Sequence, residues 1–277
     1  MNLQFKRLIA QFFFFFTANL GAVGIKSGFC FPFFYCHACP ASSAACPLRS
    51  FEISIYKVFN KEEPGIFNIK LLLFPLLILG TVGILSGRAI CGWACPFGLL
   101  QRGTGKIARK IHKKLPILKR FQQSKVDRYL RYVKYVLLIF LIFLIPMFIG
   151  FMFTDVCPNG FLVGTIPTMI LNPGGYVPAT YFYIALVILV LFLILIFTIE
   201  RGWCRYFCPL GAFLAPFNKV SMIHVAVEEK SCLHCNLCTD VCPMGIDVPN
   251  MYRDPECIYC GKCISACPKN VITFKRF

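Results

Sequence analysis

The chain has 277 residues, of which 57% are hydrophobic and only 15% are charged. Because soluble proteins average about 25% charged residues, this composition argues against an ordinary soluble domain and points to lipid as a solvent. The formal charge of +17 comes without a helix-turn-helix, zinc-finger or aromatic RNA-binding signature, so we expect no nucleic-acid partner.

Four apolar stretches approach the ~20 residues that a helix needs to cross about 30 Å of hydrocarbon. They are Leu8–Ile25, Leu71–Ser86, Tyr135–Phe153 and Ala179–Ile199. Pro75 lies inside the second stretch and predicts a kink there. The shorter apolar segment Phe161–Leu171 predicts an interfacial or re-entrant piece. The sequence therefore predicts a mainly α transmembrane fold, with a four-helix membrane domain over residues 1–217.

Basic residues are distributed unevenly about these stretches. Of the 29 Lys and Arg residues, 13 fall between Arg88 and Lys134, whereas Thr154–Thr180 contains none. By the positive-inside rule, this pattern predicts an integral protein of the cytoplasmic membrane with both termini in the cytoplasm. The segment Lys26–Lys70 would then lie outside. The basic loop from Arg102 to Lys134 is expected to contact lipid phosphate groups or an acidic partner, or only to set the topology.

The C-terminal part of the chain contains two copies of one cysteine pattern. The copies are Cys232-x2-Cys235-x2-Cys238-x3-Cys242-Pro243 and Cys257-x2-Cys260-x2-Cys263-x3-Cys267-Pro268. This is the spacing of bacterial ferredoxins, in which the fourth cysteine of each run binds the other cluster. We therefore predict an α+β ferredoxin domain over residues 218–277 with two [4Fe-4S] clusters. One cluster would be bound by Cys232, Cys235, Cys238 and Cys267, and the other by Cys242, Cys257, Cys260 and Cys263.

Zinc is the alternative metal for four thiolates. Zinc sites usually pair two short Cys-x2-Cys units across a longer gap, which differs from this repeated spacing. His234 lies inside the first run, where we expect a solvent-facing turn residue and not a ligand. Iron–sulfur clusters therefore explain the pattern better than zinc does.

A second repeat follows the second and fourth apolar stretches. It reads Arg88-x2-Cys91-x3-Cys95-Pro96-x-Gly98 and Arg201-x2-Cys204-x3-Cys208-Pro209-x-Gly211. Two cysteines four apart can share one helix face or turn, but one pair alone supplies too few ligands for a metal centre. We predict that Cys91, Cys95, Cys204 and Cys208 form one shared metal site on the inner face. Reduced structural thiols or disulfides are the alternative, although a reducing cytoplasm disfavours disulfides.

The remaining five cysteines lie on the outer side in this topology. They are Cys30, Cys36, Cys39, Cys46 and Cys157. They could supply a further metal site, with His37 as a candidate replacement ligand, or form two extracytoplasmic disulfides. The sequence leaves these alternatives open.

Together the cysteine motifs resemble those of the NapH-type membrane polyferredoxins, a family that includes quinol dehydrogenase subunits associated with periplasmic nitrate reductase. In that resemblance, the family's two membrane-proximal pairs are matched by Cys91, Cys95, Cys204 and Cys208, and the eight C-terminal cysteines match its cluster ligands. The outer cysteines depart from the quinol dehydrogenase pattern. The element Cys157-Pro158-Asn159-Gly160 resembles a third Cys-x3-Cys-Pro motif in which Phe153 stands in place of the first cysteine.

These features predict an iron–sulfur protein that passes electrons between a membrane donor or acceptor and a redox partner protein, with quinone as one candidate donor. One alternative is a metal-handling or assembly factor for another redox complex. Another is a membrane anchor and connector subunit of an oxidoreductase. The sequence contains no Rossmann fingerprint or P-loop, so we expect no substrate chemistry beyond electron transfer, as in a quinol dehydrogenase-like subunit.

Quinone chemistry would also need a proton route. Asp155 and Glu200 lie at the ends of predicted spans, where ionisable groups are often functional, although both are equally well explained as interfacial charges. No histidine lies in any of the four spans, and we therefore expect no haem bound between helices in the bilayer.

Overall fold

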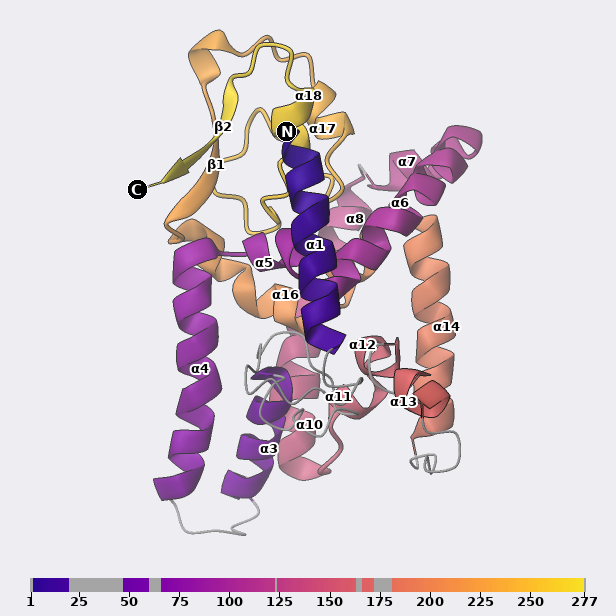
Figure 1. The fold of residues 1–277 in the computed structure, drawn as a ribbon, viewed down its shortest axis with the longest axis vertical. Helices are drawn as coiled ribbons and strands as arrows, with labels where there is room; N and C mark the ends of the chain where they lie inside the picture. Colours follow the sequence, from indigo (N-terminus) through magenta and orange to yellow (C-terminus); the bar gives the residue numbers. More distant parts are fainter. Residues whose placement is uncertain are drawn as a thin grey trace. The chain divides into compact units, whose positions relative to one another are not determined.

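The fold is known from a computed structural model that describes residues 2–19, 47–59, 66–122, 124–162, 166–171 and 181–276. Most of these residues are helical, which confirms a helix-rich chain (Figure 1). The chain forms two compact units. The first unit contains Met1–Phe13, Gly80–Lys134 and Ile196–Phe277, and the second contains Phe14–Leu79 and Tyr135–Leu195. The proposed boundary between residues 217 and 218 stays a prediction.

Three of the predicted spans correspond to single helices. These are α1 (Leu3–Asn19), α4 (Ile66–Ser86) and α14 (Phe182–Thr198). Helix α1 begins five residues before the predicted start at Leu8, because the polar residues that precede Leu8 have partners within the first unit, as described below. Its predicted end at Ile25 lies outside the described residues.

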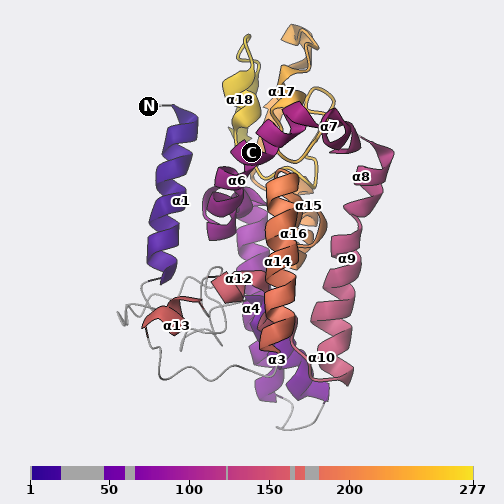
Figure 2. The ribbon, with the colours of Figure 1, turned by 90° about the vertical axis from the view of Figure 1, so that its right-hand side faces the viewer.

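The remaining predicted span is part of a longer run of helix. Its elements follow one another along the chain as one helical run (Figure 2). They are α8 (Lys125–Leu130), α9 (Val133–Leu137), the π-helical turn η2 (Leu138–Leu144) and α10 (Ile145–Phe148). Among the described helices, only Val126–Phe148 is both long and apolar enough to cross a membrane. The predicted end at Phe153 is wrong, because Gly150 adopts a left-handed conformation with φ of 69° and ends the helix.

The second unit contains a helix that the sequence analysis assigned to a loop. Helix α3 (Pro47–Phe59) packs against η2 and α10. It buries Leu48, Phe51 and Ile55, which are spaced as on one helix face. Three short helices complete this unit: α11 (Phe153–Val156), α12 (Pro158–Gly160) and α13 (Ile166–Leu171).

In the first unit, each arginine–cysteine motif folds into a pair of helices. The first motif forms α5 (Ala89–Trp93) and α6 (Pro96–Lys114), and the second forms α15 (Gly202–Tyr206) and α16 (Pro209–Leu214). The helix α7 (Pro116–Gln122) follows α6, and the 3₁₀ turn η4 (Pro216–Lys219) follows α16. Proline at the first position of α6 and of α16 favours a helix start there, because its missing N–H has no partner at that position in any case.

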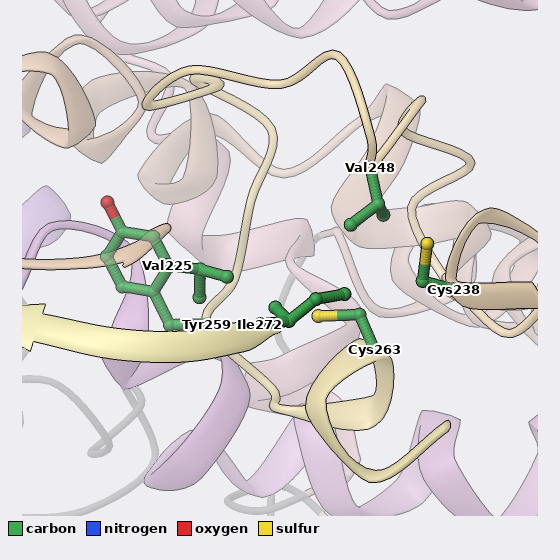
Figure 3. Packing of buried hydrophobic residues seen from close by; sticks show 6 residues of the cluster. All are labelled: Val225, Cys238, Val248, Tyr259, Cys263 and Ile272. Atoms are coloured by element: carbon green, nitrogen blue, oxygen red, sulfur yellow. The ribbon is translucent and has the colours of Figure 1, made fainter. Parts of the chain in front are cut away.

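The C-terminal part of the first unit is built on one small sheet. Strands β1 (Ile223–Val227) and β2 (Ile272–Arg276) pair antiparallel, with Val225 opposite Phe274. Between the strands lie η5 (Glu229–Ser231), α17 (Leu237–Asp240) and α18 (Lys262–Ala266). The core contains Cys238 from α17 and Cys263 from α18, together with apolar side chains from the sheet and loops (Figure 3).

Candidate functional site

The two ferredoxin-type cysteine runs have the same backbone conformation. Non-helical positive φ values recur at matching places: His234 and Tyr259 before the second cysteine, Asn236 and Gly261 after it, and Gly245 and Asn270 three residues after the fourth cysteine. Residues in the left-handed region reverse the chain tightly and turn successive N–H groups toward one centre. The repeated spacing is therefore matched by a repeated turn. His234 is exposed in the first of these turns.

Two hollows lie against these turns, and each is lined by four cysteines drawn from both runs. The first encloses about 390 Å³, open space at its mouth included, and its cysteines are Cys232, Cys235, Cys238 and Cys267. The second encloses about 360 Å³ on the same measure, and its cysteines are Cys242, Cys257, Cys260 and Cys263. The structure thus brings together the two groups of four that the sequence spacing predicts, with the fourth cysteine of each run in the other run's hollow.

The environment of these thiols suits a group that binds thiolates. Burial raises the pKa of Cys242, while the backbone N–H groups of Ile246 and Met244 bond to its sulfur and lower it. Burial and nearby thiols raise the pKa of Cys263 to about 12. Buried thiols of this kind ionise only when a bound metal stabilises the thiolate, and the N–H groups aimed at sulfur then stabilise it further. The residues therefore fit a [4Fe-4S] cluster in each hollow.

The four membrane-proximal cysteines also lie together. Burial, together with the neighbouring thiols of Cys204, Cys91 and Cys95, raises the pKa of the Cys208 thiol. All four side chains are wholly or mostly buried. Burial raises the pKa of Cys95 to about 12. The amide of Gln101 donates a hydrogen bond of 3.2 Å to the Cys204 sulfur. Four thiols from two motifs therefore form one buried group.

The arginine of each motif bonds to the other motif. Arg88 Nη2 donates to the carbonyl of Cys204 at 3.3 Å, and Arg201 Nη1 donates to the carbonyl of Cys91 at 3.0 Å. A Cβ atom on Gly98 would lie 3.2 Å from Arg201 Nη1, and one on Gly211 would lie 2.9 Å from Arg88 Nη2. Each arginine thus bonds to the backbone of the other motif, and the glycine of each motif leaves room for it. We call this reciprocal pair of contacts the arginine clasp.

The first motif also touches the second ferredoxin run. A Cβ atom on Gly92 would lie 2.2 Å from the carbonyl oxygen of Ile258, between Cys257 and Cys260. The indole of Trp93 donates to the carbonyl of Tyr259 at 2.8 Å.

Arg7 of α1 bridges the same two turns. It donates to the carbonyl of Gly92 at 2.7 Å and to that of Cys260 at 3.4 Å. Arg7 is 1% exposed, although the sequence signals it only as a basic residue directly before the apolar stretch that begins at Leu8. Together these contacts make a backbone junction between the Cys91–Cys95 turn and the turn before Cys260.

Two mostly buried carboxylates form ion pairs around this arrangement. Glu256 precedes Cys257 and pairs with Arg88 and Lys134. Glu200, one of the two proton-route candidates, pairs with Arg109 at 2.7 Å and with Lys262 of α18. Glu256 was not predicted, because its only signal in the sequence is its place directly before a cysteine run.

The outer candidates are only partly described. Cys30, His37, Cys36, Cys39 and Cys46 lie outside the described residues. Cys157 lies between α11 and α12 and is partly buried. Asp155, the other proton-route candidate, forms an ion pair of 2.7 Å with Arg49. In the described ranges, no three His, Cys, Asp or Glu side chains converge as they would around a single metal ion.

Comparisons with known proteins agree with this geometry. The sequence model of a 4Fe-4S binding domain matches residues 67–114 and 181–225, and that of a 4Fe-4S dicluster domain matches residues 218–276. The first match covers both arginine–cysteine motifs, and the second covers both ferredoxin runs. No solved structure matches the chain.

Several curated proteins are similar to the chain. Uncharacterized protein MJ0750 of Methanocaldococcus jannaschii is 34% identical over 73% of this chain and 78% of its own length. The methylamine utilization ferredoxin-type protein MauN of Methylorubrum extorquens is 30% identical over 71% of this chain and 60% of its own length. The ferredoxin-type protein NapH of Haemophilus influenzae is 26% identical over 60% of this chain and 51% of its own length. With its two 4Fe-4S domains, the chain belongs to the NapH-type polyferredoxin family.

Proposed function

We propose that the chain is a membrane-bound electron-transfer protein with three iron–sulfur centres in its first unit. Two [4Fe-4S] clusters would occupy the ferredoxin hollows, and a third centre would be held by Cys91, Cys95, Cys204 and Cys208. A cluster held by four thiolates takes up and releases one electron at a time.

The junction between Gly92 and Ile258 is the observation that carries this proposal. It presses the turn between Cys91 and Cys95 against the turn between Cys257 and Cys260, with no side chain between the two backbones. The hydrogen bonds of Arg7 and Trp93 fix that contact. Packing this close is unnecessary for two independent metal sites, but it shortens the path between two redox sites.

The arginine clasp supports the third centre. Arg88 and Arg201 are almost fully buried, and both lie against backbone of the membrane-proximal cysteine group. A centre bound by four thiolates carries net negative charge, and buried guanidinium groups would offset it. Arg88 also pairs with Glu256, so the negative charge of such a centre would mainly offset Arg201.

The proposal also assigns a partner to each end of the electron-transfer pathway. Cys235 is exposed, whereas Cys260 and Cys263 are buried. We infer that the hollow lined by Cys235 serves the redox partner protein and that the membrane-proximal group serves a membrane donor such as a hydroquinone. The hydrophobic helices α1, α4 and α14 and the run Val126–Phe148 would form the four-span domain in the cytoplasmic membrane, with both termini inside.

Reduction by a hydroquinone tests the donor. The purified protein, reconstituted in lipid vesicles without oxygen, is mixed with a menaquinol analogue, and loss of iron–sulfur absorbance is followed in time. We expect bleaching in the wild type and none in the double variant Cys91→Ser, Cys204→Ser. Dithionite should still bleach the ferredoxin clusters of that variant, which serves as the control for intact clusters.

Equal bleaching by hydroquinone in both proteins would refute the third centre as the entry point. Failure of hydroquinone to reduce either protein would refute a quinol donor. Transfer of iron to an added apo-protein, without any reduction by hydroquinone, would instead favour a metal-handling factor.

A further inference from the structure

Glu52 of α3 is a buried carboxyl in the second unit that the electron-transfer proposal does not use. Its side chain is fully buried, with 0% exposure. One carboxylate oxygen, Oε2, accepts a hydrogen bond of 2.6 Å from the hydroxyl of Thr154 and a longer one from the backbone N–H of the same residue. The other oxygen, Oε1, has no hydrogen-bond partner among the described residues. A permanently ionised carboxylate in such a place is costly, because half of it is neither solvated nor bonded.

A short hydrogen-bonded chain leads from Glu52 toward a partly exposed ion pair. Arg49 Nη1 donates to Thr154 Oγ1 at 3.2 Å and to Asp155 Oδ1 at 2.7 Å. The side chains of Arg49 and Asp155 are 21% and 31% exposed. Because Thr154 Oγ1 accepts from Arg49, its own hydrogen is directed to Glu52. The threonine hydroxyl thus joins the buried carboxyl to the polar edge of the unit.

The surroundings of Glu52 favour its protonated form. Burial is the largest influence and raises the pKa of Glu52 to about 7, with a smaller opposing effect of the Thr154 bonds. Of the charged groups that act on it, Asp155 raises the pKa and Arg49 lowers it. The elements η2 and α10, which pack on α3, contain no titratable side chain.

We propose that Glu52 is a proton-binding site, loaded and unloaded through the hydroxyl of Thr154. The proposal goes beyond the iron–sulfur function and depends on none of its centres. On loading, the O–H bond of Thr154 breaks as a bond forms between its proton and Glu52 Oε2. A hydronium ion at the Arg49–Asp155 edge restores the threonine proton and leaves as water. Arg49 orients the hydroxyl through its hydrogen bond to Thr154 Oγ1.

Infrared spectroscopy of the full chain in detergent tests this site directly. A protonated carboxyl has a C=O stretching band that disappears on ionisation, so its intensity can be titrated against pH. We expect a buried-carboxyl band in the wild type that titrates with a midpoint near pH 7. The band should be absent in Glu52→Gln and unchanged in the matched control Glu228→Gln, which alters an exposed glutamate.

Thr154→Val supplies a second readout that does not remove the carboxyl. Valine keeps the shape of threonine but cannot donate to the ionised form, so the midpoint should move to higher pH. This shift decides the question if Glu52→Gln fails to fold. A band that persists in Glu52→Gln, a wild type with no carboxyl that titrates between about pH 6 and 8, or an unmoved midpoint in Thr154→Val would overturn the proposal. None of these readouts requires electron transfer, so the two proposals can fail separately.

Discussion

The carbonyl oxygen of Ile258 lies where the side chain of any residue other than glycine at position 92 would begin, at 2.2 Å from an ideal Cβ. Gly92 is in the membrane-proximal motif, and Ile258 is in the second ferredoxin run. Their contact therefore joins the backbone of the membrane-proximal motif to the backbone of the second ferredoxin run. Its neighbours Trp93 and Arg7 donate hydrogen bonds to carbonyls on the same turn.

Gly92→Val should separate these backbones. Overpacking of a filled interior typically costs about 1–3 kcal/mol, so we expect lower thermal stability in detergent together with slower reduction of the ferredoxin clusters by hydroquinone. Gly103→Ala is the matched control. Position 103 has no atom within 4 Å of an added Cβ, and alanine in a helix should raise stability by about 0.5–1 kcal/mol. Equal stability of the two variants would mean that the contact at Gly92 is not close.

Two arginine variants distinguish the buried arginine clasp from an ion pair at the surface. Arg88→Ala removes a fully buried guanidinium that bonds to Glu256 and to the Cys204 carbonyl. Breaking a buried pair in this way should cost about 3 kcal/mol. Arg109→Ala, which removes a cation 44% exposed, should cost less than about 1 kcal/mol. Thermal unfolding of both variants measures the difference, and similar losses would contradict a structural role for the clasp.

Glu256 makes stability depend on pH. Burial alone would raise its pKa, but Arg88 and Lys134 outweigh burial and hold the pKa below the ordinary value of 4.5. A carboxylate with a lowered folded-state pKa stabilises the fold fully above its unfolded pKa, and this stabilisation is lost as the pH falls through the folded value. The stability difference between the wild type and Glu256→Gln should therefore be largest above pH 4.5 and shrink below it. Chemical unfolding followed at several pH values measures it, and a difference that grows on acidification would contradict this pairing.

Serine variants of Cys242 and Cys267 test whether the fourth cysteine of each run binds the cluster of the other run. Cys267→Ser should remove the cluster of the hollow that contains Cys232, and Cys242→Ser the cluster of the hollow that contains Cys257. Each variant should lose about four irons and one set of EPR signals, since each [4Fe-4S] cluster contains four irons. If Cys267→Ser instead disturbed the cluster of its own run, the assignment across the runs would be wrong.

Membrane orientation can be tested with reporter fusions. Alkaline phosphatase, which is active only outside the cytoplasm, is fused after Gln122 and after Phe161, on either side of the helix Val126–Phe148. We expect low activity at Gln122, which follows the basic helix α6, and high activity at Phe161. Equal activity at both positions would exclude this helix as a span.

Much of the ferredoxin part could be predicted because its ligand spacing directly constrains its backbone. Three cysteines at intervals of three require a tight turn, and the positive φ values at His234 and Tyr259 follow from that requirement. A shared site for Cys91 and Cys204 was inferable from the repeat, although its metal stays a prediction. The partner of each arginine was not, because a clasp between residues far apart in sequence leaves no periodic signal.

The second unit was less predictable. Helix α3 was assigned to a loop because it lies between two predicted spans, although Leu48, Phe51 and Ile55 have helical spacing. Glu52 lies on this helix as a single acid among apolar neighbours. Its burial depends on α10 and η2, elements about 90 residues away, and no local pattern reports such a contact.

Iron and acid-labile sulfide, counted per chain after anaerobic purification and followed by EPR during a redox titration, test the central claim most directly. Three [4Fe-4S] centres predict about twelve irons in the wild type and about eight in the double variant Cys91→Ser, Cys204→Ser. The EPR spectrum should lose one reducible species in that variant while the ferredoxin signals remain. About eight irons in both proteins would contradict a membrane-proximal centre, and zinc in place of iron would contradict the account as a whole.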